Sequence, residues 1–299
     1  MPATYRTSYQ HDPGLGDRVF ELLEIAFPGV SRGRRQGAAF GVPWEAASTP
    51  FVVREGDRVL SHVGLLRLPL WVMGRDQVVG GVHGVATDPN HRRRGLFRGL
   101  IEELIAFAAP SFETLVLTTL HPEYFEGFGF RVIPEWIGRG RPGPTEPIGS
   151  RGLDLTNAAD LALVHSLIDR RTPVSDRLGV RDEKACWGFV EFATAIRYAE
   201  ALDAAVVAER RGATLRVYDA IAARMPSLDE IVGIWGEPLD EVLLYFATDR
   251  VAGSWAVEPH DLGGGAEALS PGEANWVLMA RGPFAADGEQ VMLPRPARC

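Results

Sequence analysis

Apolar residues at helical spacing mark the first regular segment of the chain. Within residues 16–27, Val19, Leu22, Leu23 and Phe27 lie at intervals typical of one helix face. The pattern therefore predicts an amphipathic helix over this segment.

Strand patterns come next along the chain. Residues 50–72 contain two apolar runs on either side of Glu55, Gly56 and Asp57, which is typical of a β-hairpin. A valine-rich run over residues 77–87 predicts a further strand, and a short polar turn sequence ends it.

A helix and two more strands complete the pattern of the first half. From about Arg92, apolar residues recur on one side of a helix until Pro110 stops it. Residues 113–120 and 129–133 are short apolar runs that predict strands, with a short helix or turn between them. This order of elements predicts a mixed α/β (α+β) domain.

A linker divides the chain into two parts. Residues 138–152 are dense in glycine and proline and poor in large apolar side chains, which is typical of a connection between domains. We therefore expect a first domain over residues 1–137 and a second over residues 153–299. The second part again contains helical and strand patterns, including a helix in which Ser227 and Glu230 are spaced as a capping box.

Composition narrows the class of protein. The chain has 299 residues, 46% of them hydrophobic and 23% charged, and a net charge of −8. This proportion of hydrophobic and charged residues is typical of a globular protein. The negative net charge gives no indication of a nucleic-acid or membrane partner. The two cysteines, Cys186 and Cys299, form no disulfide framework and no metal-ligand cluster. With neither a signal segment nor a membrane-spanning run, we expect a cytoplasmic protein.

Positive charge is concentrated at the start of the second predicted helix, where Arg92, Arg93, Arg94 and Arg98 surround Gly95. Cations at a helix N-terminus oppose the helix dipole, at about 0.3–1 kcal/mol each. A bound phosphate would compensate, because unpaired backbone N–H groups and arginines both bind it and glycine lets the backbone approach it. We interpret the turn as an anion site; the alternative is a solvated turn rich in arginine.

The absence of two known phosphate-binding motifs narrows the identity of the bound anion only in part. The chain has no G-x-x-x-x-G-K-[ST] segment, which excludes a Walker-type P-loop, and this turn lacks G-x-G-x-x-G. On these residues alone, a dinucleotide, coenzyme A and a free nucleotide all stay open.

The segment VATDPNHRRRGLF, residues 85–97, resembles the coenzyme A signature of the GNAT-fold N-acetyltransferases, [RQ]-x-x-G-x-[GA]. Arg92 and Gly95 occupy its first two defined positions, and Phe97 stands where glycine or alanine is usual. The subset related to the enhanced-intracellular-survival acetyltransferases is similar, with HRRRGL followed by a bulkier residue. EYFEGFGF, residues 123–130, resembles the second landmark of the family, an aromatic residue followed by x-x-x-G-F.

The resemblance implies a GNAT fold with a mixed, splayed central sheet over residues 1–137 and a second, degenerate GNAT-like lobe over residues 153–299. It also implies acetyl-CoA as the acetyl donor. Backbone amides of residues 93–98 would hold the pyrophosphate, strand 84–87 would pair with the pantetheine arm, and its separation from strand 115–119 would admit the thioester. The residues assigned to coenzyme A in this way are Val85, Ala86, Thr87, Arg92, Arg93, Arg94, Gly95, Leu96, Phe97, Arg98 and Phe125.

The resemblance leaves the proton-transfer groups open. The usual general acid is a tyrosine four residues before the glycine of the terminal G-F pair, a position that Phe125 occupies here. Tyr124 lies one residue earlier, a rotation of about 100° in a helix, and is either the acid or a packing aromatic. His83 lies where many relatives carry a glutamate and is either the base or a structural residue. His121 and the carboxylate of Cys299 are weaker candidates for the base.

We expect an acetyl-CoA-dependent N-acetyltransferase that acts on a primary amine of a small molecule. A coenzyme A-binding sensor or scaffold without turnover is the alternative that Phe125 keeps open, and a nucleotide-dependent enzyme is a third. The negative net charge is compatible with a cationic acceptor, and Trp44, Trp71 and Trp136 are candidates for an acceptor groove. We expect no metal site. A homo-oligomer is compatible with the exposed strand edges of such folds.

Overall fold

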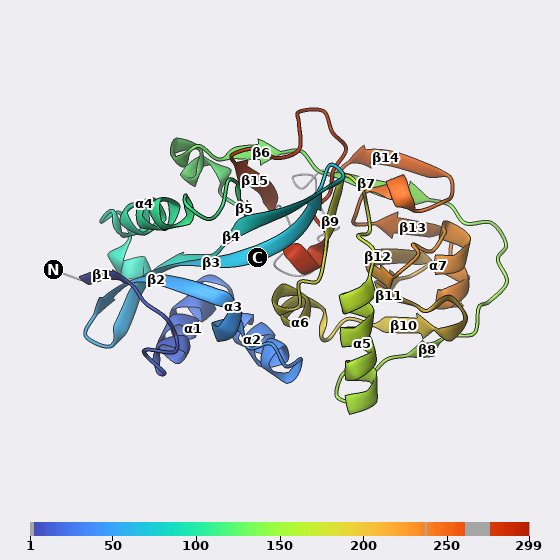
Figure 1. The fold of residues 1–299 in the computed structure, drawn as a ribbon, viewed down its shortest axis with the longest axis horizontal. Coiled ribbons are helices and arrows are strands. Elements are labelled where there is room, and N and C mark those ends of the chain that lie inside the picture. The colour runs from blue at the N-terminus through green and yellow to red at the C-terminus, as the bar shows by residue number, and fades with distance from the viewer. Residues whose placement is uncertain (1–2, 237, 261–275, 299) are drawn as a thin grey trace.

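Two mixed sheets lie side by side, each with helices on both faces (Figure 1). The computed structural model describes residues 3–236, 238–260 and 276–298. In sheet order, the strands of the first sheet are β1 (Ala3–Arg6), β2 (Ser48–Glu55), β3 (Arg58–Val72), β4 (Arg75–Thr87), β5 (Leu115–Thr119), β15 (Val277–Arg281) and β6 (Arg131–Ile133), and β9 (Leu178–Val180) pairs with β3. Those of the second sheet are β14 (Trp255–Pro259), β7 (Trp136–Gly140), β13 (Glu241–Leu244), β12 (Thr214–Ala222), β11 (Ala204–Arg211), β10 (Ile196–Ala199) and β8 (Arg151–Gly152).

Helices cover opposite faces of the first sheet because its strands alternate their apolar side chains. Leu66, Leu68 and Leu70 of β3 belong to the apolar cluster that contains α1 (Leu15–Ala26). Val63 and Leu65 belong to the cluster that contains α4 (Leu96–Ala108). In Figure 1, α1, α2 (Val30–Ala39) and α3 (Trp44–Ala47) accordingly lie on one side of β3 and β4, with α4 on the other.

The second sheet is built in the same way. Alternate residues of β11 pack toward α5 (Ala158–Arg170) on one face and toward α7 (Leu228–Trp235) on the other. Here β12, α7 and the parallel strand β13 follow one another as β4, α4 and the parallel strand β5 do in the first sheet. The expected α/β (α+β) class, with a mixed central sheet and a second lobe of sheet and helix, is thus confirmed.

Strands β4 and β5 pair over a very short distance and then separate. Their parallel register joins Gly80 to Leu115 and Gly81 to Val116. A Cβ at Gly80 would lie 2.5 Å from Cδ2 of Leu115, so glycine permits this close pairing. Beyond Gly81 no pairing joins the described residues of the two strands, and the sheet opens there.

Sequence patterns missed α2 for a physical reason. Its buried residues are Gly33 and Gly37, so the helix itself has no apolar stripe. A Cβ at Gly33 would meet the ring of Phe189 at 2.3 Å, and this ring belongs to α6 (Ala185–Glu191). The apolar side of the α2–α6 contact therefore comes from the partner helix.

Two other expectations differ from the structure in detail. The helix expected from about Arg92 begins at Leu96, because Pro89–His91 and the residues after it form a 3-10 turn and a loop. Residues 138–140 of the expected linker belong to β7, which pairs with β13 and β14. In addition, β15 comes from the predicted second domain but lies in the first sheet between β5 and β6, so the division at 138–152 does not follow the sheets. The domain boundaries stay a prediction.

A buried ion pair anchors the C-terminal segment between the lobes. Nε of Arg295 donates to Oε1 of Glu191 at 2.8 Å, and the guanidinium lies 3.5 Å from the centre of the Tyr218 ring in β12. The side chain of Glu191 is 0% exposed and that of Arg295 is 7% exposed. One charged contact thus connects α6, β12 and the last residues of the described chain.

We predict that Glu191→Gln lowers the free energy of unfolding by about 3 kcal/mol, because a buried arginine then loses its counter-charge. Urea denaturation of wild type and variant measures this. In the exposed pair of Glu209 and Arg211, Arg211→Gln is the control and is expected to cost at most about 1 kcal/mol. Equal small changes in both variants would show that the buried pair does not anchor the segment.

Candidate functional site

A cavity of about 1200 Å³ lies where β4 and β5 separate. Residues 82–87 of β4 and residues 117–119 of β5 line it from the sheet. From one face of the sheet it is lined by the start of α4, and from the other by α1, Trp44 and α6. The cavity therefore connects the two faces of the first sheet through the gap between the strands.

The start of α4 presents unpaired donors to this cavity. Gly95 is its N-cap residue, with φ of 77°, and no side chain caps the helix. Leu96, Phe97 and Arg98 form the first turn, whose backbone N–H groups have no partner within the helix. Such a terminus carries a partial positive charge and binds anions.

Backbone strain lies immediately before this helix. Arg93 has φ of 61°, a left-handed conformation that costs energy in a residue with a side chain. Nε of Arg92 donates to the carbonyl of Thr87 at 3.3 Å, and Arg94 donates to the carbonyl of Asn90 at 3.4 Å. Arg92, Arg93 and Arg98 line the cavity, whereas Arg94 does not.

Asp88 fixes the turn between β4 and the arginines. Its carboxylate accepts from the backbone N–H of Asn90 at 2.8 Å, lies 3.2 Å from Nδ1 of His91, and pairs with Arg58. Burial disfavours its charged form, but these three partners outweigh burial and hold the pKa of Asp88 below its usual value. The turn thus has a charged anchor of its own.

The corresponding helix of the second lobe is closed to an anion. Ser227 and Glu230 cap α7 with a capping box, and Asp229 adds another negative charge to its first turn. The capping box predicted from the sequence is confirmed. Only the first of the two equivalent helix starts is therefore open to a phosphate.

A bulge bends β4 at the cavity wall. Gly84 has φ of 57°, and the pairing register of β3 and β4 shifts at this point. Nδ1 of His62 lies 2.7 Å from the carbonyl oxygen of Gly84, so this nitrogen carries the proton and donates. Val85, Ala86 and Thr87 follow the bulge and line the cavity.

His83 lies within the wall and is almost fully buried. Its Nε2 lies 2.8 Å from Oγ of Ser48, and its ring meets the edge of Trp44 at a centroid distance of 4.8 Å. Gly64 makes room for the imidazole, because a Cβ there would approach it to 2.1 Å. Burial, aided by neighbouring His62, lowers the pKa of His83 well below its usual value. The imidazole is therefore neutral near pH 7.

Tyr124 and Phe125 differ sharply in burial. Tyr124 ends the 3-10 turn Pro122–Tyr124, is 58% exposed, and stacks on His121 at 4.9 Å. Phe125 is 4% exposed and packs against Phe97 and Phe130. Both line the cavity, but only Tyr124 brings a hydroxyl group to it.

The structure thus brings together at one cavity all the assigned site residues except Arg94. Two weaker candidates from the sequence, His121 and Trp44, also line it. Trp71 and Trp136 do not line it, and Cys299 lies outside the described residues. Sequence patterns missed several lining residues from distant parts of the chain, namely Phe27, Cys186, Phe189, Val190, Trp276 and Arg298. No local motif marks them, because chain packing alone brings them to the site.

Metal-ligand groups and membrane-spanning helices were sought among the described residues. In the part of the chain that the structure covers, no group of three or more histidine, cysteine, aspartate or glutamate residues is placed to hold a metal ion. Among the described helices, none has the length and apolar character needed to cross a membrane.

Comparisons with known proteins concern the domain family and the fold. Residues 15–133 match the family model described as an acetyltransferase (GNAT) domain. No curated protein matches the chain in sequence. Solved structures share the fold. A probable N-acyltransferase from Enterococcus faecalis has a TM-score of 0.62 and 12% identity, over 94% of this chain and 72% of that one. Eis1 from Mycobacterium abscessus has a TM-score of 0.55 and 15% identity, over 94% of this chain and 73% of that one. A GCN5-related N-acetyltransferase from Kribbella flavida has a TM-score of 0.54 and 16% identity, over 93% of this chain and 70% of that one.

The buried histidine beside the bulge predicts a pH dependence of stability. Burial lowers the pKa of His62 to about 4, although its bond to the Gly84 carbonyl opposes this. Since this pKa is below the value near 6.5 of the unfolded chain, the unfolded state binds the extra proton first. The stability linked to neutral His62 is complete above pH 6.5 and is lost as pH falls toward 4.

We therefore predict that wild type loses about 3 kcal/mol more stability than His62→Gln between pH 7 and pH 4. Glutamine keeps a donor for Gly84 but does not titrate. Urea denaturation at a series of pH values measures the difference. Parallel pH curves for wild type and His62→Gln would contradict the assignment.

Proposed function

Because residues 15–133 belong to the GNAT acetyltransferase family, we propose that this protein transfers the acetyl group of acetyl-CoA to a primary amine of a small molecule. One observation carries the proposal. An uncapped helix start flanked by arginines and a gap between two parallel strands open into the same cavity.

The pyrophosphate of coenzyme A would lie at the start of α4. The backbone N–H groups of Leu96, Phe97 and Arg98 would donate to its oxygens. Arg92 and Arg93 would add charge-assisted hydrogen bonds. The strain at Arg93 is then understandable, because the left-handed conformation helps to turn the backbone toward the ligand. Arg94 does not line the cavity and would contribute least.

The pantetheine arm and the thioester would occupy the gap between the strands. Val85, Ala86 and Thr87 lie beyond the positions at which β4 pairs with β5, and their backbone groups would pair with the amides of the arm. The acceptor amine would attack the thioester carbonyl from the opposite face of the sheet. A C–N bond forms and the C–S bond breaks; the nitrogen loses a proton and the thiolate gains one, so that an amide and free coenzyme A result.

Tyr124 is the group that we propose for protonation of the thiolate. It has the exposed hydroxyl at the cavity, whereas Phe125, at the position usual for the acid, lies in the core beside Phe97. His83, held neutral, would accept a hydrogen bond from the amine or the water next to it. Its lowered pKa makes it a weak base, so its role would be to orient the acceptor.

The buried Phe125 also favours a second candidate function. A protein that binds coenzyme A without turnover needs the helix start and the strand gap but no acid. The two candidates differ in the role of Tyr124, which matters only for the enzyme.

For both candidates we predict that Gly95→Asp abolishes measurable binding of coenzyme A, because a carboxylate at the helix start repels the pyrophosphate. Gly95→Asn is the matched control, since asparagine has the same shape and also tolerates the left-handed conformation. No atom lies within 4 Å of a Cβ at this position, so both side chains fit. Calorimetric titration with coenzyme A measures the loss; equal affinities in the two variants would show that the phosphates bind elsewhere.

For the enzyme we predict that Tyr124→Phe lowers kcat by about 10²-fold or more and leaves the affinity for acetyl-CoA unchanged. The exposed ring still stacks on His121 in this variant, so only the hydroxyl is lost. Thiol release in the presence of an amine measures kcat. An unchanged kcat would assign the proton transfer to another group, and no release by wild type with any amine would favour the binding protein.

A further inference from the structure

The two halves of the cavity differ in chemistry. The half on the side of α4 carries the guanidinium groups of Arg92, Arg93 and Arg98. The half on the side of α1 is lined by large apolar side chains, among them Phe20, Leu23, Phe27, Trp44, Phe189 and Trp276. Since the first half fits phosphate, the second half is the space left for the acceptor.

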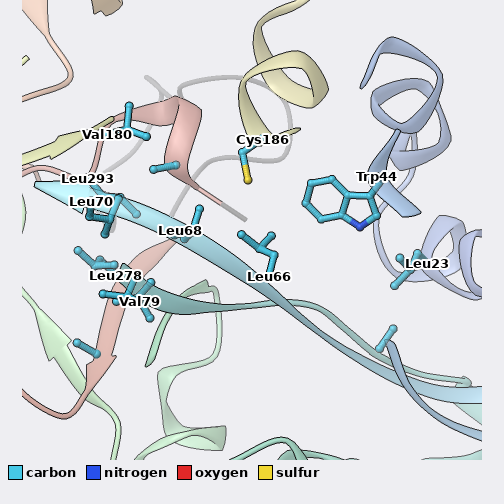
Figure 2. Close-up of a cluster of buried hydrophobic side chains, with 14 of the residues drawn as sticks. Leu23, Trp44, Leu66, Leu68, Leu70, Val79, Val180, Cys186, Leu278 and Leu293 are labelled. Carbon is cyan, nitrogen blue, oxygen red and sulfur yellow. The ribbon is translucent and has the colours of Figure 1, made fainter. Parts of the chain in front are cut away.

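Aromatic rings from separate elements meet in this second half. Trp44 lies against Phe189 at a centroid distance of 4.8 Å, and Phe27 lies against Trp276 at 5.9 Å. Phe27, Phe189 and Trp276 are only partly buried. Figure 2 shows Trp44 between Cys186 and Leu23, with the sulfur of Cys186 turned toward β3. The wall is thus apolar across α1, α3 and α6.

Acidic side chains are scarce among the described residues that line the cavity. Of the described residues that line it, Glu123 is the only one with a carboxylate, and this group is 58% exposed and lies 3.1 Å from His121. Arg298 also lines the cavity, and its guanidinium pairs with buried Glu135. Among the described residues of the lining, a polycation would therefore find little counter-charge, even though the chain as a whole has a net charge of −8.

We propose that the acceptor is a primary amine carried on an apolar, aromatic body, such as an arylalkylamine. This inference rests on the proposed function and names the substrate class for the same site. The flat ring of such an amine would pack against the tilted aromatic side chains of the cavity, at ring-centroid distances similar to those between Trp44 and Phe189 or between Phe27 and Trp276. A polyamine or an aminoglycoside would lose its hydration at this wall and would meet, among the described lining residues, the carboxylate of Glu123 alone.

The apolar wall also suits the chemistry of the amine. An ammonium group cannot attack a carbonyl, and removal of water disfavours that charged form relative to the neutral amine. An apolar cavity therefore increases the fraction of the nucleophilic form at neutral pH. This effect reduces the demand for a strong base, which agrees with a neutral His83 beside the acceptor space.

Two measurements on wild type test the substrate class. The first is calorimetric titration of 2-phenylethylamine and of 1,4-diaminobutane into the protein, with and without saturating coenzyme A. The second is thiol release from acetyl-CoA with each amine and with an aminoglycoside. We expect kcat/KM for 2-phenylethylamine to be at least about tenfold higher than kcat/KM for 1,4-diaminobutane or for the aminoglycoside.

A matched pair of variants locates the contact. Phe27→Ala removes a ring from the wall and is expected to raise KM for 2-phenylethylamine about tenfold, without changing KM for acetyl-CoA. Phe107→Ala is the control, because Phe107 is also partly exposed but lies on α4 outside the cavity lining. Phe189→Leu keeps apolar packing over Gly33 and removes only the ring, so it separates loss of the contact from loss of the fold.

The outcomes separate this inference from the proposed function. A preference for the diamine or the aminoglycoside would overturn the aromatic class and leave the transferase intact. Transfer to 1,4-diaminobutane that is faster from octanoyl-CoA than from acetyl-CoA, and that 2-phenylethylamine inhibits by competing with the octanoyl chain, would assign the apolar half to the acyl chain. This result would also overturn the aromatic class of acceptor. If 2-phenylethylamine binds but coenzyme A does not, the amine site stands and the proposed function fails. If coenzyme A binds but 2-phenylethylamine does not, the proposed function stands and the aromatic class of acceptor fails.

Discussion

The separation of β4 from β5 is the constraint on which the rest of the site depends. Two paired positions hold the strands together at Gly80 and Gly81, and the register ends there. One side of the opening then faces α4 and the other faces α1, because the alternating side chains of β3 assign those helices to opposite faces. A ligand that passes through the gap meets positive charge on one side and aromatic rings on the other.

The two lobes show how a similar framework is opened or closed to an anion. Each contains a strand, a helix and a parallel strand in succession. In the second lobe, Ser227 and Glu230 satisfy the donors at the start of α7. In the first, Gly95 leaves the donors of α4 without a side-chain cap, and the arginines around it add charge. Local capping chemistry, more than the fold, distinguishes the lobe with the candidate site.

The sequence predicted what local chemistry determines and missed what packing determines. Periodicity indicated α1, the hairpin of β2 and β3, and the strand–helix–strand unit around the arginines, and the fold class is confirmed. It did not indicate α2, whose contact with α6 is made by glycines under Phe189, or the return of β15 into the first sheet. Of the apolar half of the cavity, the sequence offered only Trp44 as a candidate, because Phe27, Phe189 and Trp276 come from distant segments that packing alone brings together. Apart from Phe125, the predicted coenzyme A residues lie within residues 85–98, so a local motif was enough to indicate them.

A structure of the protein with bound coenzyme A tests the central claim most directly. The account predicts pyrophosphate oxygens within about 3 Å of the backbone nitrogens of Leu96, Phe97 and Arg98. It also predicts the pantetheine arm between β4 and β5, with the sulfur near the bulge at Gly84. Coenzyme A bound elsewhere, with the gap between the strands empty, would contradict it.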